Sequence, residues 1–251
     1  MILLAENLTA AQGGVQVLHV PHLVVEQGRV MAVVGPNGSG KTTLLLCLGG
    51  LLAATGGMIL FGGREMAGSS GRASLRRAVT MVFQEPLLFD STVAANIETG
   101  LRIRGIKRAV RAERVEESAV LFGISHLLGR SARKLSGGES QRASLARAFA
   151  FAPEVLLMDE PFAALDAPSK QSLLADLGAI LKQTGSTAVF STHDLSEAIA
   201  LADNMAVLNG GLLVRHGPTR EVLASPEDPF VAAALASAKA MAQQVMEATG
   251  I

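Results

Sequence analysis

The sequence contains no tryptophan and no tyrosine, and Cys47 is the single cysteine among its 251 residues. One cysteine excludes an internal disulfide and is typical of a chain from a reducing compartment. The 22 Lys and Arg residues equal the 22 Asp and Glu residues in number, so no net charge draws the chain to nucleic acid or anionic lipid. No basic run is interleaved with aromatic residues either. We therefore expect no nucleic-acid partner.

A membrane span is the next class to exclude. Residues 42–63 carry no charge and match the length of a bilayer span of ~20 residues. Glycine pairs at 49–50 and 56–57, however, divide this stretch into a helix, a turn and a strand. The N-terminal MILLAENL is too short for a signal peptide and already carries Glu6. We expect a chain without a transmembrane segment.

Short apolar runs recur between helix-like stretches. Continuous Val, Leu and Met runs of this kind predict buried strands of a largely parallel sheet, and hence an α/β fold. Ligands of such sheets bind at the carboxyl ends of the strands, and four of the runs end in chemically reactive residues. We expect one shared site there. The runs cover residues 30–35, 79–84, 155–161, 187–194 and 205–211.

The residue pattern changes between the second and third apolar runs. Two helix-like stretches with charged faces lie there, and no strand pattern is present. We predict a core formed by residues 1–85 and 151–229, with residues 86–150 forming an inserted helical subdomain. The Ala-rich residues 230–251 predict a C-terminal helix.

The motif GPNGSGKTT follows a predicted strand and precedes a predicted helix, which is the context that a phosphate-binding loop requires. Its glycines free the backbone to wrap phosphates, while Lys41 reaches the β/γ oxygens. Thr42 would coordinate Mg²⁺, and Thr43 would add a phosphate contact. The predicted nucleotide-binding residues of this loop are Gly35, Pro36, Asn37, Gly38, Ser39, Gly40, Lys41, Thr42 and Thr43.

Three other strand ends supply the remaining chemistry. Asp159 can hold Mg²⁺ through its water shell, and Glu160 can orient an attacking water. Gln84 could contact both the Mg²⁺ and the water, and His193 could hold a γ-phosphate. Taken singly, a strand-end histidine is more often structural, and an acidic pair often only starts a loop. Cys47 lies in an apolar run, where packing as a small hydrophobe is the expected role.

A second glycine loop, KLSGGESQRASLARA at residues 134–148, lies in the predicted helical subdomain. One nucleotide needs only one phosphate cradle, and this loop has no lysine placed to hold phosphate. Its natural target is the γ-phosphate of a nucleotide bound to another copy of the chain. Two chains arranged head to tail would then bury two ATP molecules, and hydrolysis would depend on association.

Along nearly its whole length the sequence resembles the ATP-binding subunits of ABC transporters. The motifs that carry the resemblance are GPNGSGKT, Gln84, LSGGESQR, LLMDEP, ALDA around Asp166, and STHD, in that family's order and spacing. The resemblance implies a RecA-like P-loop core with a helical subdomain, ATP and Mg²⁺ as cofactors, and a head-to-tail dimer.

The same resemblance assigns roles to individual residues. Glu160 would be the catalytic base, with His193 and Gln84 completing the catalytic group. Thr42, Gln84 and Asp159 would hold the metal, and Asp166 would couple the two sites across the dimer. The second loop would contact the nucleotide in trans through Ser136, Gly137, Gly138 and Glu139.

Two positions depart from the family pattern. Gln12 stands where the family has an aromatic residue that stacks on adenine, although Val17 could still pack on the ring. Stacking is worth ~1–3 kcal/mol per base, so we expect ATP affinity lower by roughly one to two decades. The other departure is Glu139, where the most common signature has Gln.

Because the chain carries no membrane segment, the resemblance implies separate integral membrane permease subunits. It favours a bacterial importer with an extracytoplasmic substrate-binding protein and places the chain peripherally, on the cytoplasmic face of the inner membrane. Residues 86–89 (PLLF) would be either core of the helical subdomain or a groove for a cytoplasmic helix of the permease.

Residues 81–105 and 159–167 look most like oxyanion importers of the tungstate and molybdate kind. Two alternatives stay open: an ABC ATPase that drives a non-uptake membrane complex, as in lipoprotein release or cell division, and one that acts on DNA or ribosomes. Proteins of the last class usually carry long coiled-coil insertions, paired ATPase units or a basic face, and none is visible in this sequence.

Overall fold

The computed structural model describes residues 1–224, 229, 231–233, 235 and 236. Within these residues the strands form one sheet in the order β5-β4-β1-β2-β10-β9-β3-β8-β7-β6. The strands are β1 (Leu3–Gln12), β2 (Val15–Val25), β3 (Val30–Val34), β4 (Gly56–Phe61), β5 (Arg64–Glu65), β6 (Val79–Val82), β7 (Val155–Asp159), β8 (Ala188–Thr192), β9 (Asn204–Asn209) and β10 (Leu212–Pro218).

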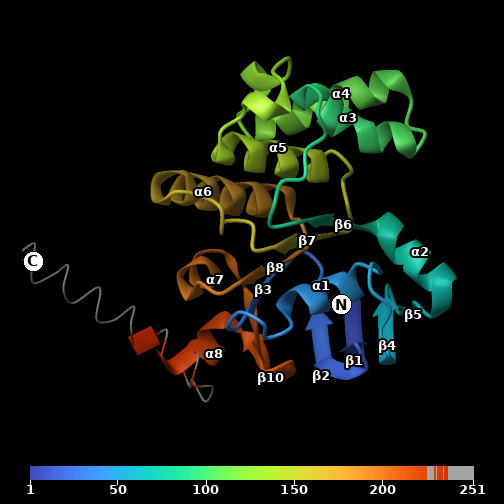
Figure 1. Cartoon of the computed structure of the whole chain (residues 1–251), viewed down its shortest axis with the longest axis vertical. Helices are drawn as coiled ribbons and strands as arrows, with labels where there is room; N and C mark the ends of the chain where they lie inside the picture. Colours follow the sequence, from blue (N-terminus) through green and yellow to red (C-terminus); the bar gives the residue numbers. More distant parts are fainter. Residues whose placement is uncertain (225–228, 230, 234, 237–251) are drawn as a thin grey trace, which may run out of the picture.

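Helices cover the sheet and fill the long connection between β6 and β7 (Figure 1). The helices are α1 (Lys41–Leu48), α2 (Gly68–Ala78), α3 (Val93–Ile103), α4 (Arg108–Leu121), α5 (Gly137–Phe149), α6 (Ala167–Thr184), α7 (Leu195–Leu201) and α8 (Thr219–Ala224), with 3-10 turns η1 (Ser125–Leu127) and η2 (Ala132–Lys134).

Strands β9, β3, β8, β7 and β6 pair in parallel, as the apolar runs predict. Every residue of β3, β7 and β8 is buried, because helices cover both faces of this part of the sheet. Side chains alternate between the faces. Ala32 and Val34 join the apolar cluster that includes α6, whereas Val33 joins the cluster that includes α1. The α/β prediction is confirmed.

The sheet is mixed, and its continuous run of parallel strands is confined to that half. Strands β1, β2, β4 and β5 pair antiparallel with one another, and β10 is antiparallel to β9. Strand β10 joins the two halves by pairing in parallel with β2, at Leu212 and His19. In β1 the buried residues Ala5, Leu8 and Ala10 are separated by more exposed ones, so this strand does not show the continuous apolar run of a parallel strand. Gly13 and Gly14, with φ of 58° and 81°, close the β1–β2 hairpin, since such turns need positive φ.

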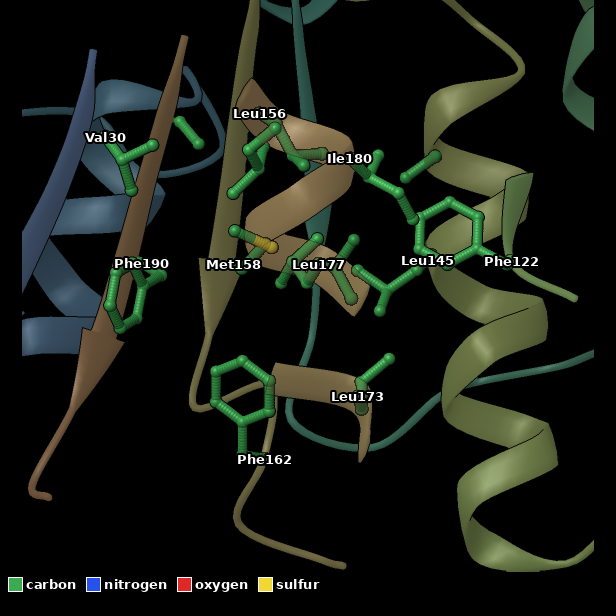
Figure 2. Packing of buried hydrophobic residues seen from close by; sticks show 14 of the residues in the cluster. Val30, Phe122, Leu145, Leu156, Met158, Phe162, Leu173, Leu177, Ile180 and Phe190 are labelled. Atoms are coloured by element: carbon green, nitrogen blue, oxygen red, sulfur yellow. The ribbon is translucent and has the colours of Figure 1, made fainter. Parts of the chain in front are cut away.

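Helices α3, α4 and α5 lie in the range predicted for a helical subdomain and are seen above the sheet in Figure 1. Figure 2 shows that this part shares its core with the sheet: Phe122 and Leu145 pack toward Leu177 of α6, which packs toward Met158 of β7. The boundaries at 85/86 and 150/151 therefore stay a proposal. The predicted helix over 230–251 lies outside the described residues, apart from 231–233, 235 and 236.

Residues 42–63 form most of α1, a turn, and strand β4, as the glycine pairs predict. Among the helices that the structure describes, every one is too short or too polar to cross a bilayer.

Candidate active site

The order of the parallel strands determines where the predicted site residues meet. Strands β3, β8, β7 and β6 are neighbours, and each is followed by one of the reactive segments. The glycine loop follows β3, His193 follows β8, Glu160 follows β7, and Gln84 lies just beyond β6. All four segments leave the same edge of the sheet.

The glycine loop turns tightly into α1. Gly38 and Gly40 have φ of 78° and 96°, which only glycine adopts without strain. A Cβ at Gly35 would lie 2.1 Å from the carbonyl oxygen of Leu208, so a larger residue is excluded there. Gly40 is the N-cap of α1 and offers no side chain to the first backbone N–H groups. These groups and the helix dipole favour an anion at this end.

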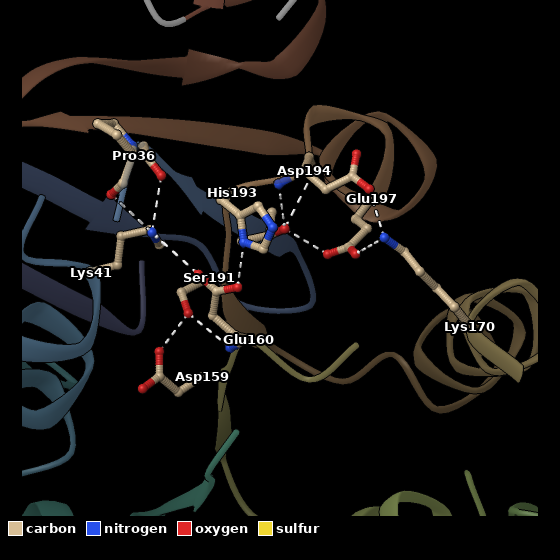
Figure 3. A network of polar contacts seen from close by, with 11 residues as sticks. Pro36, Lys41, Asp159, Glu160, Lys170, Ser191, His193, Asp194 and Glu197 are labelled. Carbon is tan, nitrogen blue, oxygen red and sulfur yellow. Dashed lines mark hydrogen bonds and ion pairs between the residues drawn. The ribbon is translucent and has the colours of Figure 1, made fainter. Parts of the chain in front are cut away.

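The side chain of Lys41 folds back onto the glycine loop. Its Nζ donates hydrogen bonds to the carbonyl oxygens of Gly35, at 2.9 Å, and Pro36, at 3.2 Å. It also forms an ion pair with Oε1 of Glu160 at 3.2 Å, and its side chain is only 6% exposed (Figure 3). The ammonium is thus pre-positioned at the mouth of the loop.

Glu160 is the centre of the polar network. Its backbone has φ of 45°, a strained value for a non-glycine residue and one that is common at functional sites. Its N–H donates to Oγ of Ser191 at 2.9 Å, and that hydroxyl donates to Oδ1 of Asp159 at 2.6 Å. Oε2 of Glu160 lies 2.6 Å from Nδ1 of His193. A carboxylate held this way can accept a proton from water while the imidazole stays oriented.

A cavity of about 340 Å³ opens between these segments. Its lining comes from the glycine loop, from the N-terminal hairpin and from the ends of β6 and β7. The residues that line it are Gln12, Val17, Asn37, Gly38, Gly40, Lys41, Thr42, Thr43, Gln84 and Glu160.

Five more predicted residues adjoin this cavity without lining it. Gly35 and Pro36 bind Lys41 through their carbonyls, and His193 and Asp159 join the network around Glu160. Ser39 is 2% exposed, and its Oγ has no hydrogen-bond partner within the described part of the chain. A buried hydroxyl without a partner beside a phosphate-type loop fits an anionic ligand.

The donors also suit Mg²⁺. Thr42, Gln84 and Asp159 offer the oxygen atoms that this cation prefers, and Oδ2 of Asp159 is free of the Ser191 bond. Within the described residues no group of three or more His, Cys, Asp or Glu could hold a metal ion by itself. Mg²⁺ is usually bound through one or two protein oxygens plus the phosphates of its nucleotide, so the residues present fit a metal that arrives with the nucleotide.

The second glycine loop does not reach this cavity. Ser136, Gly137, Gly138, Glu139 and Asp166 are all absent from its lining. Ser136 is the N-cap of α5, where its Oγ accepts a hydrogen bond from N–H of Glu139 and its own N–H donates to Oε2 of Glu139, at 2.7 Å. Glu139 thus completes a capping box with Ser136, and its carboxylate also pairs with Arg130 at 3.2 Å.

Three residues that support the site are not predicted from the sequence. Ser191 lies in the STHD motif, and a fully buried hydroxyl in an apolar strand could have indicated its role. Lys170 and Glu197, which contact each other at 2.5 Å, belong to two different helices and carried no signal of their own.

Comparison with known proteins decides the family. The sequence profile described as "ABC transporter" matches residues 18–163, more than half of the chain. The chain belongs to the ABC transporter family. ATP-binding subunits of this family hydrolyse ATP to power transport, and the fold and motifs described above are those of their P-loop ATPase domain.

The similar proteins are named as ATP-binding subunits of import systems. The sulfate/thiosulfate import ATP-binding protein CysA of Caulobacter vibrioides is 44% identical over 214 residues, which are 83% of this chain and 62% of that protein. The Fe(3+) ions import ATP-binding protein FbpC of Streptomyces coelicolor is 40% identical over 232 residues, 92% of this chain and 66% of that protein. The chain thus spans less than two thirds of the length of these relatives.

A solved structure shares the fold. The structure of cbiO1 from Clostridium perfringens, part of the ABC transporter complex cbiONQ, superposes with a TM-score of 0.82 at 30% sequence identity. The match covers 90% of this chain and 92% of that one.

Proposed function

We propose that this chain is the ATP-hydrolysing subunit of a bacterial importer. The observation that carries the proposal is the contact of Glu160 with both Lys41 and His193, at the edge of the cavity lined by the glycine loop. A base, a phosphate-binding cation and an orienting imidazole in one place are what hydrolysis of a phosphoanhydride requires.

Each residue has a distinct part in this reaction. The loop from Gly35 to Thr43 binds the phosphates through its backbone N–H groups and Lys41. Thr42, Gln84 and Asp159 would hold Mg²⁺, which neutralises developing charge on the phosphate oxygens. Glu160 accepts the proton of the attacking water. His193 steadies the Glu160 carboxylate and faces the γ-phosphate.

The second loop acts on a second copy of the chain. Ser136 and Gly137 are exposed, and Gly138 and Glu139 are half-buried at the start of α5, outside the cavity. The backbone N–H groups there, with the Ser136 hydroxyl, suit a γ-phosphate carried by the partner. Asp166 is exposed at the start of α6 and would contact the opposite site. A head-to-tail dimer with two bound ATP molecules satisfies both loops.

The permease would dock in a groove of about 660 Å³ that residues 85–90 share with the start of α5 and residues 161–165. Leu87 and Phe89 are each 56% exposed in it, which is unusual for large apolar side chains. The guanidinium of Arg147 donates to the carbonyl oxygens of Pro86 and Leu87 and holds this segment in place. A cytoplasmic helix of a membrane subunit fits such a groove.

The cargo we propose is a small oxyanion delivered by an extracytoplasmic binding protein, with this chain on the cytoplasmic face of the inner membrane. Relatives named for sulfate and thiosulfate import support the oxyanion class. Residues 81–105 and 159–167 look most like the tungstate and molybdate branch. Relatives named for Fe³⁺ import make iron the second candidate.

Two measurements test the proposal. Purified chain should release phosphate from ATP, and the Glu160→Gln variant should not. Cells lacking the gene should lose uptake of labelled sulfate, molybdate or tungstate, and regain it with the wild-type gene but not with Glu160→Gln. Loss of Fe³⁺ uptake alone would replace the oxyanion with iron. Unchanged uptake of all four would contradict both proposed cargoes.

A further inference from the structure

Lys170 joins two carboxylates from a different helix. Its Nζ lies 2.6 Å from Oδ2 of Asp194 and 2.5 Å from Oε1 of Glu197 (Figure 3). Lys170 belongs to the first turns of α6, whereas Asp194 is the N-cap of α7 and Glu197 lies in its first turn. The Lys170 side chain is 27% exposed and that of Glu197 only 5%. One ammonium therefore holds the start of α7 against α6.

The network holds the chain on both sides of His193, the residue that contacts Glu160. Oε2 of Glu197 accepts a hydrogen bond from Oγ1 of Thr192 at 2.6 Å, and the same hydroxyl accepts one from N–H of Asp194 at 2.9 Å. Oδ1 of Asp194 accepts hydrogen bonds from the backbone and hydroxyl of Ser196. His193 lies between Thr192 and Asp194, so both of its neighbours in the chain are fixed by this network.

Lys170 and Asp194 each stabilise the charged form of the other. Burial raises the pKa of Asp194, but hydrogen bonds from Lys170 and Ser196 outweigh it and hold that pKa below its usual value. Burial lowers the pKa of Lys170, yet the hydrogen bonds to Asp194 and Glu197 leave it raised. Both shifts favour the charged forms of Lys170 and Asp194 at neutral pH. Without the ammonium, two carboxylates would face each other, one of them buried without a cation.

Lys170 also lies one helical turn from the exposed end of α6. Its backbone N–H donates to the carbonyl oxygen of Asp166 at 2.9 Å. The turn that begins at Asp166 and the loop that carries His193 are thus connected through one residue, by its backbone on one side and its side chain on the other.

We propose that Lys170 is a positioning residue that holds His193 on Glu160 and links that contact to the Asp166 turn. The inference rests on the proposed ATPase function. It assigns to Lys170 no contact with nucleotide. Its removal would let the His193 loop move relative to Glu160 while leaving the glycine loop and its nucleotide contacts intact.

The test compares Lys170→Met with Lys170→Arg, which keeps the charge, and with Lys182→Met, which removes an exposed lysine from the last turn of the same helix. Histidine-labelled protein gives ring signals from five histidines, and His193→Ala identifies that of His193. In Lys170→Met we expect the His193 signal to shift and the others to stay. In Lys170→Arg the His193 signal should lie close to its wild-type position. In Lys182→Met all five signals should stay at their wild-type positions.

Kinetics provide the second readout. Misplacement of a catalytic group typically costs up to about a hundredfold, so Lys170→Met should lower kcat by about tenfold or more. The KM for ATP should stay within about twofold, because the glycine loop binds the nucleotide and Lys170 has no contact with it. If Lys170→Met does not fold, Asp194→Asn removes one carboxylate of the network and keeps a residue that caps α7, and it should shift the same signal.

An unshifted His193 signal in a folded Lys170→Met protein would overturn the proposal, whether or not kcat falls. A shift of all histidine signals together would also overturn it, because Lys170 would then support the fold as a whole. If the wild-type chain hydrolyses no ATP, the proposed function fails, but the signal of His193 still decides whether Lys170 positions it.

Discussion

Nζ of Lys41 lies 3.2 Å from Oε1 of Glu160, and the two side chains are only 6% and 12% exposed. The cation that should hold phosphate is thus paired with the carboxylate that should activate water. Incoming phosphates carry more charge than one carboxylate, so they can replace Oε1 of Glu160 as the partner of the ammonium, while Oε2 keeps its contact with His193. Nucleotide binding would then also free Oε1 to accept a proton from water.

Replacing Glu160 with Gln should keep ATP binding and stop turnover. The amide cannot accept the proton of water, and loss of a general base typically costs ~10²–10⁴-fold in rate. Loss of the ion pair also frees Lys41 for phosphate. Light scattering should then show a monomer without ATP and a dimer with it, while phosphate release falls. Normal hydrolysis by this variant would show that the catalytic assignment is wrong.

Ser136→Arg should leave ATP binding by the monomer intact and abolish hydrolysis that depends on the dimer, since a long cation would fill the position meant for the partner's γ-phosphate. The substitution also removes the N-cap of α5, at a cost of ~0.5–2 kcal/mol. Ser136→Ala is the matched control because it removes the cap and the hydroxyl without adding bulk or charge. If Ser136→Arg is as active as Ser136→Ala, no γ-phosphate of a partner approaches this position.

Gln12→Tyr should tighten ATP binding. Gln12 is exposed at the cavity, and an aromatic ring there would stack on the base for ~1–3 kcal/mol, or about 5- to 150-fold in Kd. Titration calorimetry with ATP, repeated on Gln12→Ala, measures the effect of the ring alone. If tyrosine changes nothing, the base is held by another part of the chain.

Glu139→Gln should let the dimer form at lower ATP concentration. The backbone N–H of Ser136 lowers the pKa of Glu139 most, and Arg130 acts in the same direction, so this carboxylate is charged at neutral pH. A negative charge here repels the approaching γ-phosphate, and glutamine keeps the capping box without it. The ATP concentration at half dimerisation measures the change. An increase would mean that the Glu139–Arg130 pair organises the loop.

Cys47 should resist alkylation in the native protein. It is 1% exposed, and burial raises the pKa of its thiol to about 11. Because the thiolate is the reactive form, modification by iodoacetamide at pH ~8 should need unfolding. Mass spectrometry of native and denatured samples compares the two rates. Rapid labelling of the native chain would show that α1 opens readily.

The sequence predicts the convergence of the site for a physical reason. Parallel neighbouring strands leave the sheet at one edge, so polar residues after β6, β7 and β8 must approach the glycine loop. The network around Lys170 follows no such rule. Its partners lie 24 and 27 positions along the chain, and they meet only because α6 packs beside α7. The positive φ of Glu160 also arises from its surroundings, because local preference disfavours it.

The antiparallel half of the sheet was missed for a related reason. Strands such as β2 place His19 and His22 among apolar residues, since part of each strand faces outward. Alternation of this kind is weaker than a continuous apolar run and is easily taken for a loop.

Helix α5 has a mechanical consequence. Ser136 caps one end, and Arg147, in the last turn, grips the backbone of Pro86 and Leu87. At 1.5 Å per residue a helix of this length is a rod of roughly 20 Å. If a membrane subunit docks on the Pro86–Leu87 segment, as proposed, its push would tilt this rod and move the Ser136 end, which is the end proposed to contact the second nucleotide. The coupling would then require no refolding of the helix.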